Sequence, residues 1–328
     1  MDGGIVMTED EAIQLEELYD RLDKADTEDE LRETAEKILE LDRKNACGRL
    51  ALWKAMEIDE AMDNLELLEE ALEDQRTRVQ AMDTPPSVSS DRDAQVYGSM
   101  LLNLAQSYLS LAWSDDENPD LDKEEQALAL GRELLQLDKK EEFFPARDLI
   151  YRCMLDLQMY NDIFRMLEDE DEPSVMGEHA RVIAMIETDA DAGEIRDAML
   201  YAISLAPDVP TLLLGIWEMP EGEDVDEDEE LTAMYANYLA VPWCANDRRI
   251  TTLSVPAFLF CYLTERLEDA KEISALEECY ESLDIFEEVR EAKQRIEALP
   301  AEETQLEEID SYALGEVGQL VEKMAEKQ

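Results

Sequence analysis

Glycine, proline and strand-forming patterns are scarce in this chain. Its 328 residues include 11 glycines and 11 prolines, and 45% of the residues are hydrophobic. Leucine, alanine, glutamate, methionine and arginine, which favour helices, are abundant. No stretch alternates between polar and apolar residues for long enough to predict a sheet. We therefore expect an all-α protein with a packed core rather than a disordered acidic chain.

Histidine and cysteine offer little material for catalysis. His179 is the single histidine, so any Cys–His or Ser–His–Asp site would have to use it. It lies at a helix position that usually holds a large packing residue, and we expect a packing or rim role. The five cysteines are far apart, which indicates neither a disulfide framework nor a C-x-x-C metal site. We predict that the chain is not an enzyme and uses no cofactor.

Positive charge is also scarce. There are 29 Lys and Arg residues against 84 Asp and Glu, which gives a net charge of −55. Such a chain repels phosphates, so we expect neither direct nucleic-acid binding nor binding to anionic membranes. The charge permits basic partners, but a generally acidic proteome would produce the same surface without any function. Cysteine usage and the absence of a signal peptide or a membrane-spanning run favour a cytoplasmic location.

One acidic run imitates the start of a calcium-binding loop. It is Asp224-x-Asp226-x-Asp228, but Glu229 stands where the loop needs glycine and Tyr235 where it needs glutamate. We interpret this run as a solvated loop and predict no metal site.

A 34-residue pattern is the strongest positive signal. Residues 176–209 hold two amphipathic segments, and Asp191 with Glu194 forms a capping box that begins the second one. Pro207 ends it. Residues 12–45 repeat this order, with Thr27 at the position that Asp191 occupies. One helix pair cannot bury its own apolar face, so the pattern predicts neighbouring pairs.

These pairs resemble the tetratricopeptide repeat (TPR), whose period is 34 residues. Leu104-Ala105-x-x-Tyr108 matches the core of a TPR first helix, and the repeat endings at Leu137 and Leu205 stand two periods apart. The resemblance covers about residues 12–209. It implies a right-handed α-solenoid of antiparallel helix pairs, a TPR-like superhelix, that binds proteins or peptides. Residues 206–220 also resemble suppressor-of-tumorigenicity-type TPR proteins, whose role is too general to transfer.

The pattern suggests a domain organisation. We expect a flexible leader at 1–11, TPR-like repeats at 12–213 with a loop at 84–92 and an acidic loop at 114–122, an acidic loop at 214–230, and a C-terminal helical region at 231–328 that continues or caps the stack.

Three local signals refine this outline. Asp122 with Glu125 predicts one helix start, and Asp284 with Glu287 predicts another. Pro242-Trp243 predicts a turn. The final helix, at 302–323, contains Gly315 and Gly318 and should be weaker than the others.

The resemblance also implies which residues face a ligand, because the first helix of each TPR pair lines the concave groove. The corresponding positions hold Arg49, Lys54, Asn103, Gln106, Arg147, Arg152 and Arg181. In so acidic a chain these residues could form an anion-binding strip, or they could pair with neighbouring carboxylates. The Lys and Asn pairs with which chaperone-binding TPR proteins hold a terminal carboxylate are absent.

We therefore predict a non-catalytic protein–protein interaction scaffold that binds a protein or peptide segment, with basic partners permitted, in its concave groove. The alternative is an acidic decoy or chaperone that masks the basic surface of a nucleic-acid-binding protein. The two differ in salt dependence, because charge pairing is screened within about 8 Å at physiological salt. The sequence does not set the oligomeric state.

Overall fold

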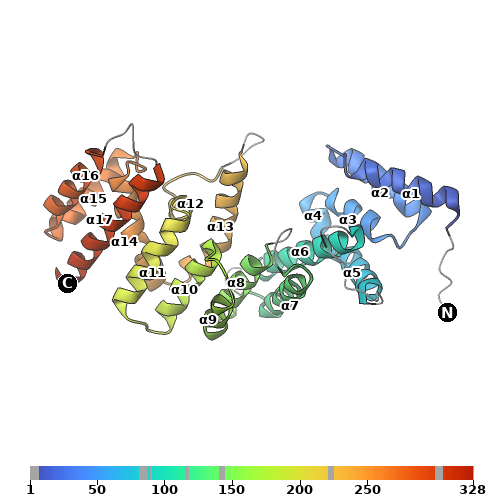
Figure 1. The fold of residues 1–328 in the computed structure, drawn as a ribbon, viewed down its shortest axis with the longest axis horizontal. Helices are drawn as coiled ribbons and strands as arrows, with labels where there is room; N and C mark the ends of the chain where they lie inside the picture. Colours follow the sequence, from blue (N-terminus) through green and yellow to red (C-terminus); the bar gives the residue numbers. More distant parts are fainter. Residues whose placement is uncertain are drawn as a thin grey trace. The chain divides into compact units, whose positions relative to one another are not determined.

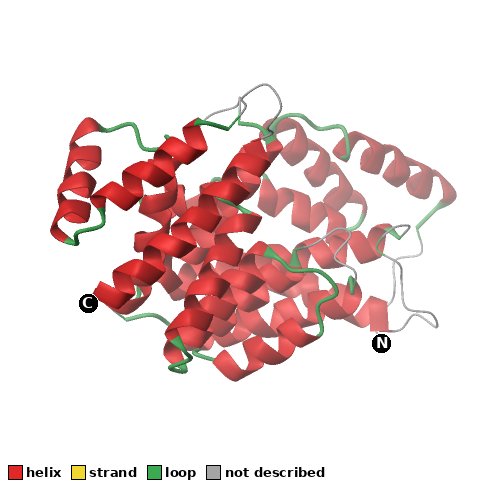
Figure 2. Ribbon diagram, turned by 60° about the vertical axis from the view of Figure 1, so that its left-hand side comes forward, coloured by secondary structure: helices red, strands yellow, loops and turns green. Residues whose placement is uncertain are grey.

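The computed structural model is helical throughout the part of the chain that it describes, and the predicted all-α class is confirmed (Figures 1 and 2). It describes residues 7–80, 88, 91–114, 118–139, 145–220, 225–299 and 306–327, which form seventeen α-helices and no strand. The chain divides into two compact units, Met1–Cys153 and Met154–Gln328. This division falls inside a helix of the stretch that we predicted as repeats.

The first unit is a succession of helices that pack in chain order. Contacts join α1 to α2, α2 to α3, α3 to α5, α5 to α6 and α6 to α7. The helices are α1 (Glu9–Leu22), α2 (Glu28–Leu41), α3 (Ala46–Lys54), α4 (Ile58–Asp63), α5 (Leu65–Gln80), α6 (Arg92–Ala112), α7 (Leu121–Leu137) and most of α8 (Ala146–Asp156). The helix pair predicted at 12–45 is therefore present as α1 and α2.

Side-chain caps set the starts of these helices. The hydroxyl of Thr27 accepts a hydrogen bond from the amide of Glu30, as predicted for α2. The predicted start of α7 at Asp122 is wrong. Asp120 is its N-cap and accepts from the amides of Asp122 and Lys123, because the chain before it is extended and leaves those amides without helical partners.

The predicted loops lie partly outside the described residues. Residues 1–6 of the leader are not described, and α1 begins within its last part, at Glu9. Of the loop at 84–92, only Val88 and residues 91–92 are described, and α6 begins at Arg92. Residues 115–117 and 221–224 of the two acidic loops are also outside the described part.

In the second unit, the last helix packs against helices that come much earlier in the chain. α17 packs against α11, α14 and α16, and α10 packs against α9, α11, α13 and α14. The helices are α9 (Tyr160–Glu168), α10 (Val175–Glu187), α11 (Ala192–Leu205), α12 (Asp208–Leu213), α13 (Glu227–Cys244), α14 (Asp247–Leu263), α15 (Ala270–Ser282), α16 (Phe286–Glu297) and α17 (Leu306–Lys327). Two helices in contact, α10 and α11, occupy the stretch predicted at 176–209, and Asp191 is the N-cap of α11.

Pro242 and Pro256 lie inside helices of this unit, beyond the first turn. The turn predicted at Pro242-Trp243 is wrong, because Pro242 belongs to the last turn of α13 and Trp243 is fully buried. Proline removes one amide donor from a helix, a loss that is smaller near the end of the helix than at its middle. Pro256, by contrast, lies near the middle of α14.

Four connections in this unit share one backbone geometry. In each, an exposed non-glycine residue has a left-handed φ between 54° and 60°, and the next amide donates to a carbonyl five residues earlier. This is the Schellman turn that ends many helices. The left-handed residues are Gln158, Asp189, Glu265 and Asp284. The predicted cap by Asp284 is therefore wrong, because this residue belongs to the turn and α16 begins only after Ile285.

None of the helices in the described part of the chain combines the length and the apolar character needed to cross a membrane.

Candidate functional site

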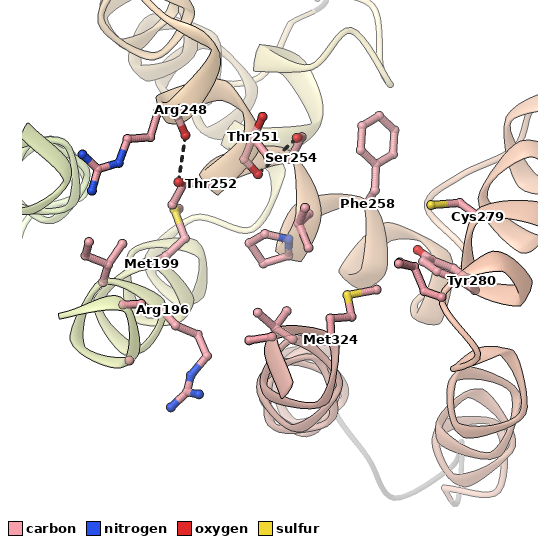
Figure 3. Close-up of a pocket in the computed structure, with 18 of the residues that line it drawn as sticks. Arg196, Met199, Arg248, Thr251, Thr252, Ser254, Phe258, Cys279, Tyr280 and Met324 are labelled. Atoms are coloured by element: carbon pink, nitrogen blue, oxygen red, sulfur yellow. Dashed lines mark hydrogen bonds between the residues drawn. The ribbon is translucent and has the colours of Figure 1, made fainter. Parts of the chain in front are cut away.

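A groove in the second unit is the candidate binding surface. α11, α14, α15 and α17 line it, and its volume is about 550 Å³. Figure 3 shows Met199, Phe258 and Met324 around the opening, with Arg196 and Arg248 on one side of it. We call this surface the unit-2 groove.

The spacing of residues along α14 explains how this helix contributes a long side of the unit-2 groove. Arg248, Thr252 and Val255 follow one another at intervals of four and three residues, Thr251 precedes Val255 by four, and all of them line it. Such residues share one face of a helix. Val255 keeps 37% of its surface exposed there. The apolar lining residues of α14, Val255 to Phe258, fall within about one turn, and the lining residues before them are polar.

The lining contains no carboxylate. None of the lining residues is Asp or Glu, in a chain where 84 of 328 residues are. An exposed apolar surface that excludes the commonest surface residues of its own chain is typical of a binding face.

Several polar side chains along the groove have partners, whereas Cys279 is a free, exposed cysteine and the buried hydroxyl of Tyr280 has no hydrogen-bond partner within the described residues. Thr252 donates from Oγ1 to the carbonyl of Arg248 at 2.8 Å, within α14. Arg248 pairs with Asp189 at 2.7 Å. Arg196 pairs with Asp197 at 2.8 Å and lies 3.6 Å from Glu322. The groove thus offers apolar contact and few polar groups that are free to bind or to react.

The seven residues predicted from the repeat frame lie elsewhere. Arg49 donates from Nε to the carbonyl of Arg43 at 3.2 Å, and its Nη1 lies 3.6 Å from Asp74. Lys54 is exposed at the end of α3 and forms no ion pair within the described residues. Asn103 donates to the carbonyl of Ser99 in its own helix at 2.6 Å.

The remaining four differ in exposure. Gln106 is exposed on α6, and Arg147 is half-buried on α8. Arg152 is 4% exposed, and its guanidinium lies 5.7 Å from the ring centre of Trp113. Arg181, which belongs to the second unit, pairs with Glu178 on α10 at 3.1 Å. Arg49 and Arg181 thus pair with nearby carboxylates, and a ligand-binding role for the seven residues stays a prediction.

His179 packs inside the second unit, as predicted. It is fully buried, and its ring meets that of Trp243 edge-on at 5.8 Å between centres. Burial lowers the pKa of His179 to about 4. Neither ring nitrogen has a hydrogen-bond partner within the described residues. An imidazole in this position is neutral near pH 7 and does not reach the surface.

The acidic run that imitates a calcium loop is only partly described. Asp224 lies outside the described residues, and Asp226 is the N-cap of α13, where it accepts from the amide of Glu229 at 2.9 Å. Within the described ranges, no group of three or more His, Cys, Asp or Glu side chains could hold a metal ion.

Our sequence interpretation missed the unit-2 groove. One signal pointed to it: residues 250–264, which include most of α14, carry no charged side chain. The other helices that line it are separated along the chain, from Ala192 to Ala325, and only their packing brings them together. No family model matches the chain, and neither curated proteins nor solved structures show significant similarity to it.

Proposed function

We propose that this chain is a non-catalytic scaffold that binds a segment of another protein, and that it is built as a right-handed, TPR-like α-solenoid of antiparallel helix pairs. The unit-2 groove is the observation that carries the binding proposal. It exposes apolar side chains and contains no carboxylate, although the surface around it belongs to a strongly acidic chain.

The repeat architecture is supported by two helix pairs whose second helices begin in the same way. α2 and α11 occupy the same half of their 34-residue frames, and each starts at a side-chain cap, Thr27 or Asp191. Helix pairs that each bury one face against a neighbour are the unit of a solenoid.

A non-catalytic role is supported by the state of the polar groups. His179 is buried, and the hydroxyl of Thr252 and both groove arginines are occupied by partners from the same unit. Cys279 places an exposed thiol in the groove, but such a nucleophile needs an activating base, and no Asp, Glu or His is among the lining residues. The groove fits binding through apolar contact better than it fits chemistry.

A pull-down with matched variants tests this function. Val255→Lys places a long charged side chain in the groove, and Ile58→Lys adds the same residue at a position that is 81% exposed in the first unit. Both substitutions put a good helix former on a helix surface. Circular dichroism would show whether each variant folds. We expect partners of the wild type to be retained by Ile58→Lys and lost by Val255→Lys.

Salt separates this proposal from the acidic decoy, which the net charge of −55 favours. Capturing partners at about 0.1 M and again at about 0.5 M salt distinguishes binding through packed apolar contacts, which survives the higher salt, from binding through charge pairs, which salt screens. Basic partners that disappear at the higher salt and ignore Val255→Lys would contradict the scaffold and support the decoy. A third variant, Arg147→Glu with Arg181→Glu, tests the residues predicted from the repeat frame. If partners were lost only with that variant, the binding site would lie at the residues predicted from the repeat frame and not in the unit-2 groove.

A further inference from the structure

We infer that the unit-2 groove takes a basic amphipathic helix of the partner protein. This inference rests on the proposed function and adds the class of segment that binds.

The polar groups of the groove favour a helix over an extended peptide. An extended segment exposes an amide and a carbonyl at every residue, and these groups need partners once they are buried. The groove is built from helices, whose backbone groups bond within each helix, and the hydroxyls of Thr252 and Ser254 bond to carbonyls of α14. The hydroxyl of Tyr280 has no partner within the described residues, but it is buried. A helical segment satisfies its own backbone, so it loses nothing in such a groove.

The dimensions of the groove suit a short helix. The lining residues of α14 extend from Arg248 to Phe258, and a helix rises about 1.5 Å per residue, so this side measures roughly 15 Å. About three turns of a partner helix would match that length. Apolar residues at i, i+3, i+4 and i+7 would form the face that contacts Val255, Phe258 and Met324.

The charges around the groove call for a basic partner. Each of its two arginines is already paired with an aspartate, Asp189 for Arg248 and Asp197 for Arg196. Glu272 is exposed one helical turn before Leu276, which lines the groove, and it forms no ion pair within the described residues. The second unit as a whole has 44 acidic and 12 basic residues. A field of this sign accelerates encounter with cations and repels anions.

Three labelled peptides of about 14 residues, roughly four helical turns, provide the test. The first has leucine at i, i+3, i+4 and i+7 and lysine elsewhere. The second replaces each lysine with glutamate, and the third rearranges the first so that leucine and lysine alternate. Fluorescence anisotropy gives the affinity of each peptide for the full chain. We expect only the first to bind well, with the other two at least about tenfold weaker.

Two pairs of variants locate the binding. Val255→Lys should weaken the first peptide at least about tenfold, and Ile58→Lys should leave its affinity unchanged. Glu272→Gln should weaken it about two- to fivefold, the range of one exposed charge pair. Glu278→Gln is the control, because Glu278 is exposed on the same helix but lies half a turn away from the lining residue Leu276.

Equal binding of the first peptide to wild type and to Val255→Lys would overturn the inference. So would tighter binding of the glutamate peptide, or equal binding of the alternating peptide. The pull-down distinguishes a failure of this inference from a failure of the proposed function. A partner that depends on Val255, seen together with any of these results, means that the scaffold binds a segment of another kind. The absence of any such partner means that the proposed function itself is wrong.

Discussion

Arg249 donates a hydrogen bond from Nη1 to the carbonyl oxygen of Pro242 at 2.8 Å, and this bond joins α14 to the end of α13. The last carbonyls of a helix have no partner within it, so the guanidinium supplies one. Arg249 also donates from Nε to Glu187 at 2.7 Å and from Nη2 to the hydroxyl of Tyr160 at 2.8 Å. One side chain, 5% exposed, therefore connects α9, α10, α13 and α14.

Removing this guanidinium should destabilise the second unit strongly. We expect Arg249→Met to lower the free energy of unfolding by about 3–5 kcal/mol, because it leaves Glu187 without its buried partner. Arg249→Lys should recover only part of that loss, because an ammonium cannot reach three acceptors arranged for a planar fork. Urea denaturation followed by circular dichroism measures both variants.

The adjacent arginine provides the control. The side chain of Arg248 is 55% exposed and pairs with Asp189, whose side chain is 83% exposed. Arg248→Met should therefore cost less than about 1 kcal/mol. Equal losses for the two arginines would mean that the contacts of Arg249 do not hold these helices together.

His179 should make stability depend on pH. Burial lowers its pKa from the ordinary 6.5 to about 4. As the pH falls below 6.5, the unfolded chain takes up a proton that the folded chain refuses until about pH 4. The free energy of unfolding should therefore fall across this window, by ~3 kcal/mol in total, and His179 should contribute no pH dependence above about pH 7.

His179→Phe isolates this contribution, because phenylalanine keeps an aromatic ring next to Trp243 and cannot titrate. The carboxylates titrate in both proteins, so the difference between the two pH profiles belongs to the imidazole. Profiles that run parallel from pH 7 to pH 4 would contradict a buried neutral histidine.

The two glycines of α17 should respond differently to alanine. A Cβ at Gly315 would meet nothing within 4 Å, so Gly315→Ala should stabilise the chain by about 0.5–1 kcal/mol through helix propensity. A Cβ at Gly318 would lie 3.0 Å from Cδ1 of Leu200 on α11. We expect Gly318→Ala to gain less in thermal denaturation, because Leu200 must shift. An equal gain at both positions would show that α17 does not approach α11 closely.

Glycine at the left-handed position of these turns should stabilise the folded chain. A left-handed φ costs an ordinary residue about 1–2 kcal/mol, and glycine adopts it freely. Gln158→Gly should therefore raise the free energy of unfolding by about 1 kcal/mol. Asp169→Gly is the control, because Asp169 ends α9 with a right-handed φ of −94°, where glycine only adds freedom to the unfolded chain. If both substitutions were destabilising, the turn at Gln158 would not be left-handed.

Most helices could be predicted because local signals define them. Thr27 and Asp191 are side-chain caps, and apolar residues at helical spacing follow each of them. α4 was missed because it is six residues long and begins with Ile58, which is 81% exposed, so it carries no apolar face. Asp122 was misassigned because Asp120, two residues earlier, also has a carboxylate that can cap.

The unit-2 groove could not be predicted in the same way. Met199, Val255 and Met324 come from three helices, and their proximity depends on the packing of α17 against α11 and α14. Pro242 was misread for a related reason. A proline next to a helix end is compatible with a turn or with a last helical turn, and the carbonyl of Pro242 meets Arg249 only in the folded unit.

The left-handed turns leave little trace in the sequence. Gln158, Asp189, Glu265 and Asp284 share one geometry but include three residue types, because backbone atoms close each turn and the side chains lie at the surface. Substitutions can accumulate at such positions over evolutionary time without changing the path of the chain. In proteins whose helices are joined by such turns, related chains would then keep the same order of helices and turns after the residues at the turns had ceased to resemble one another.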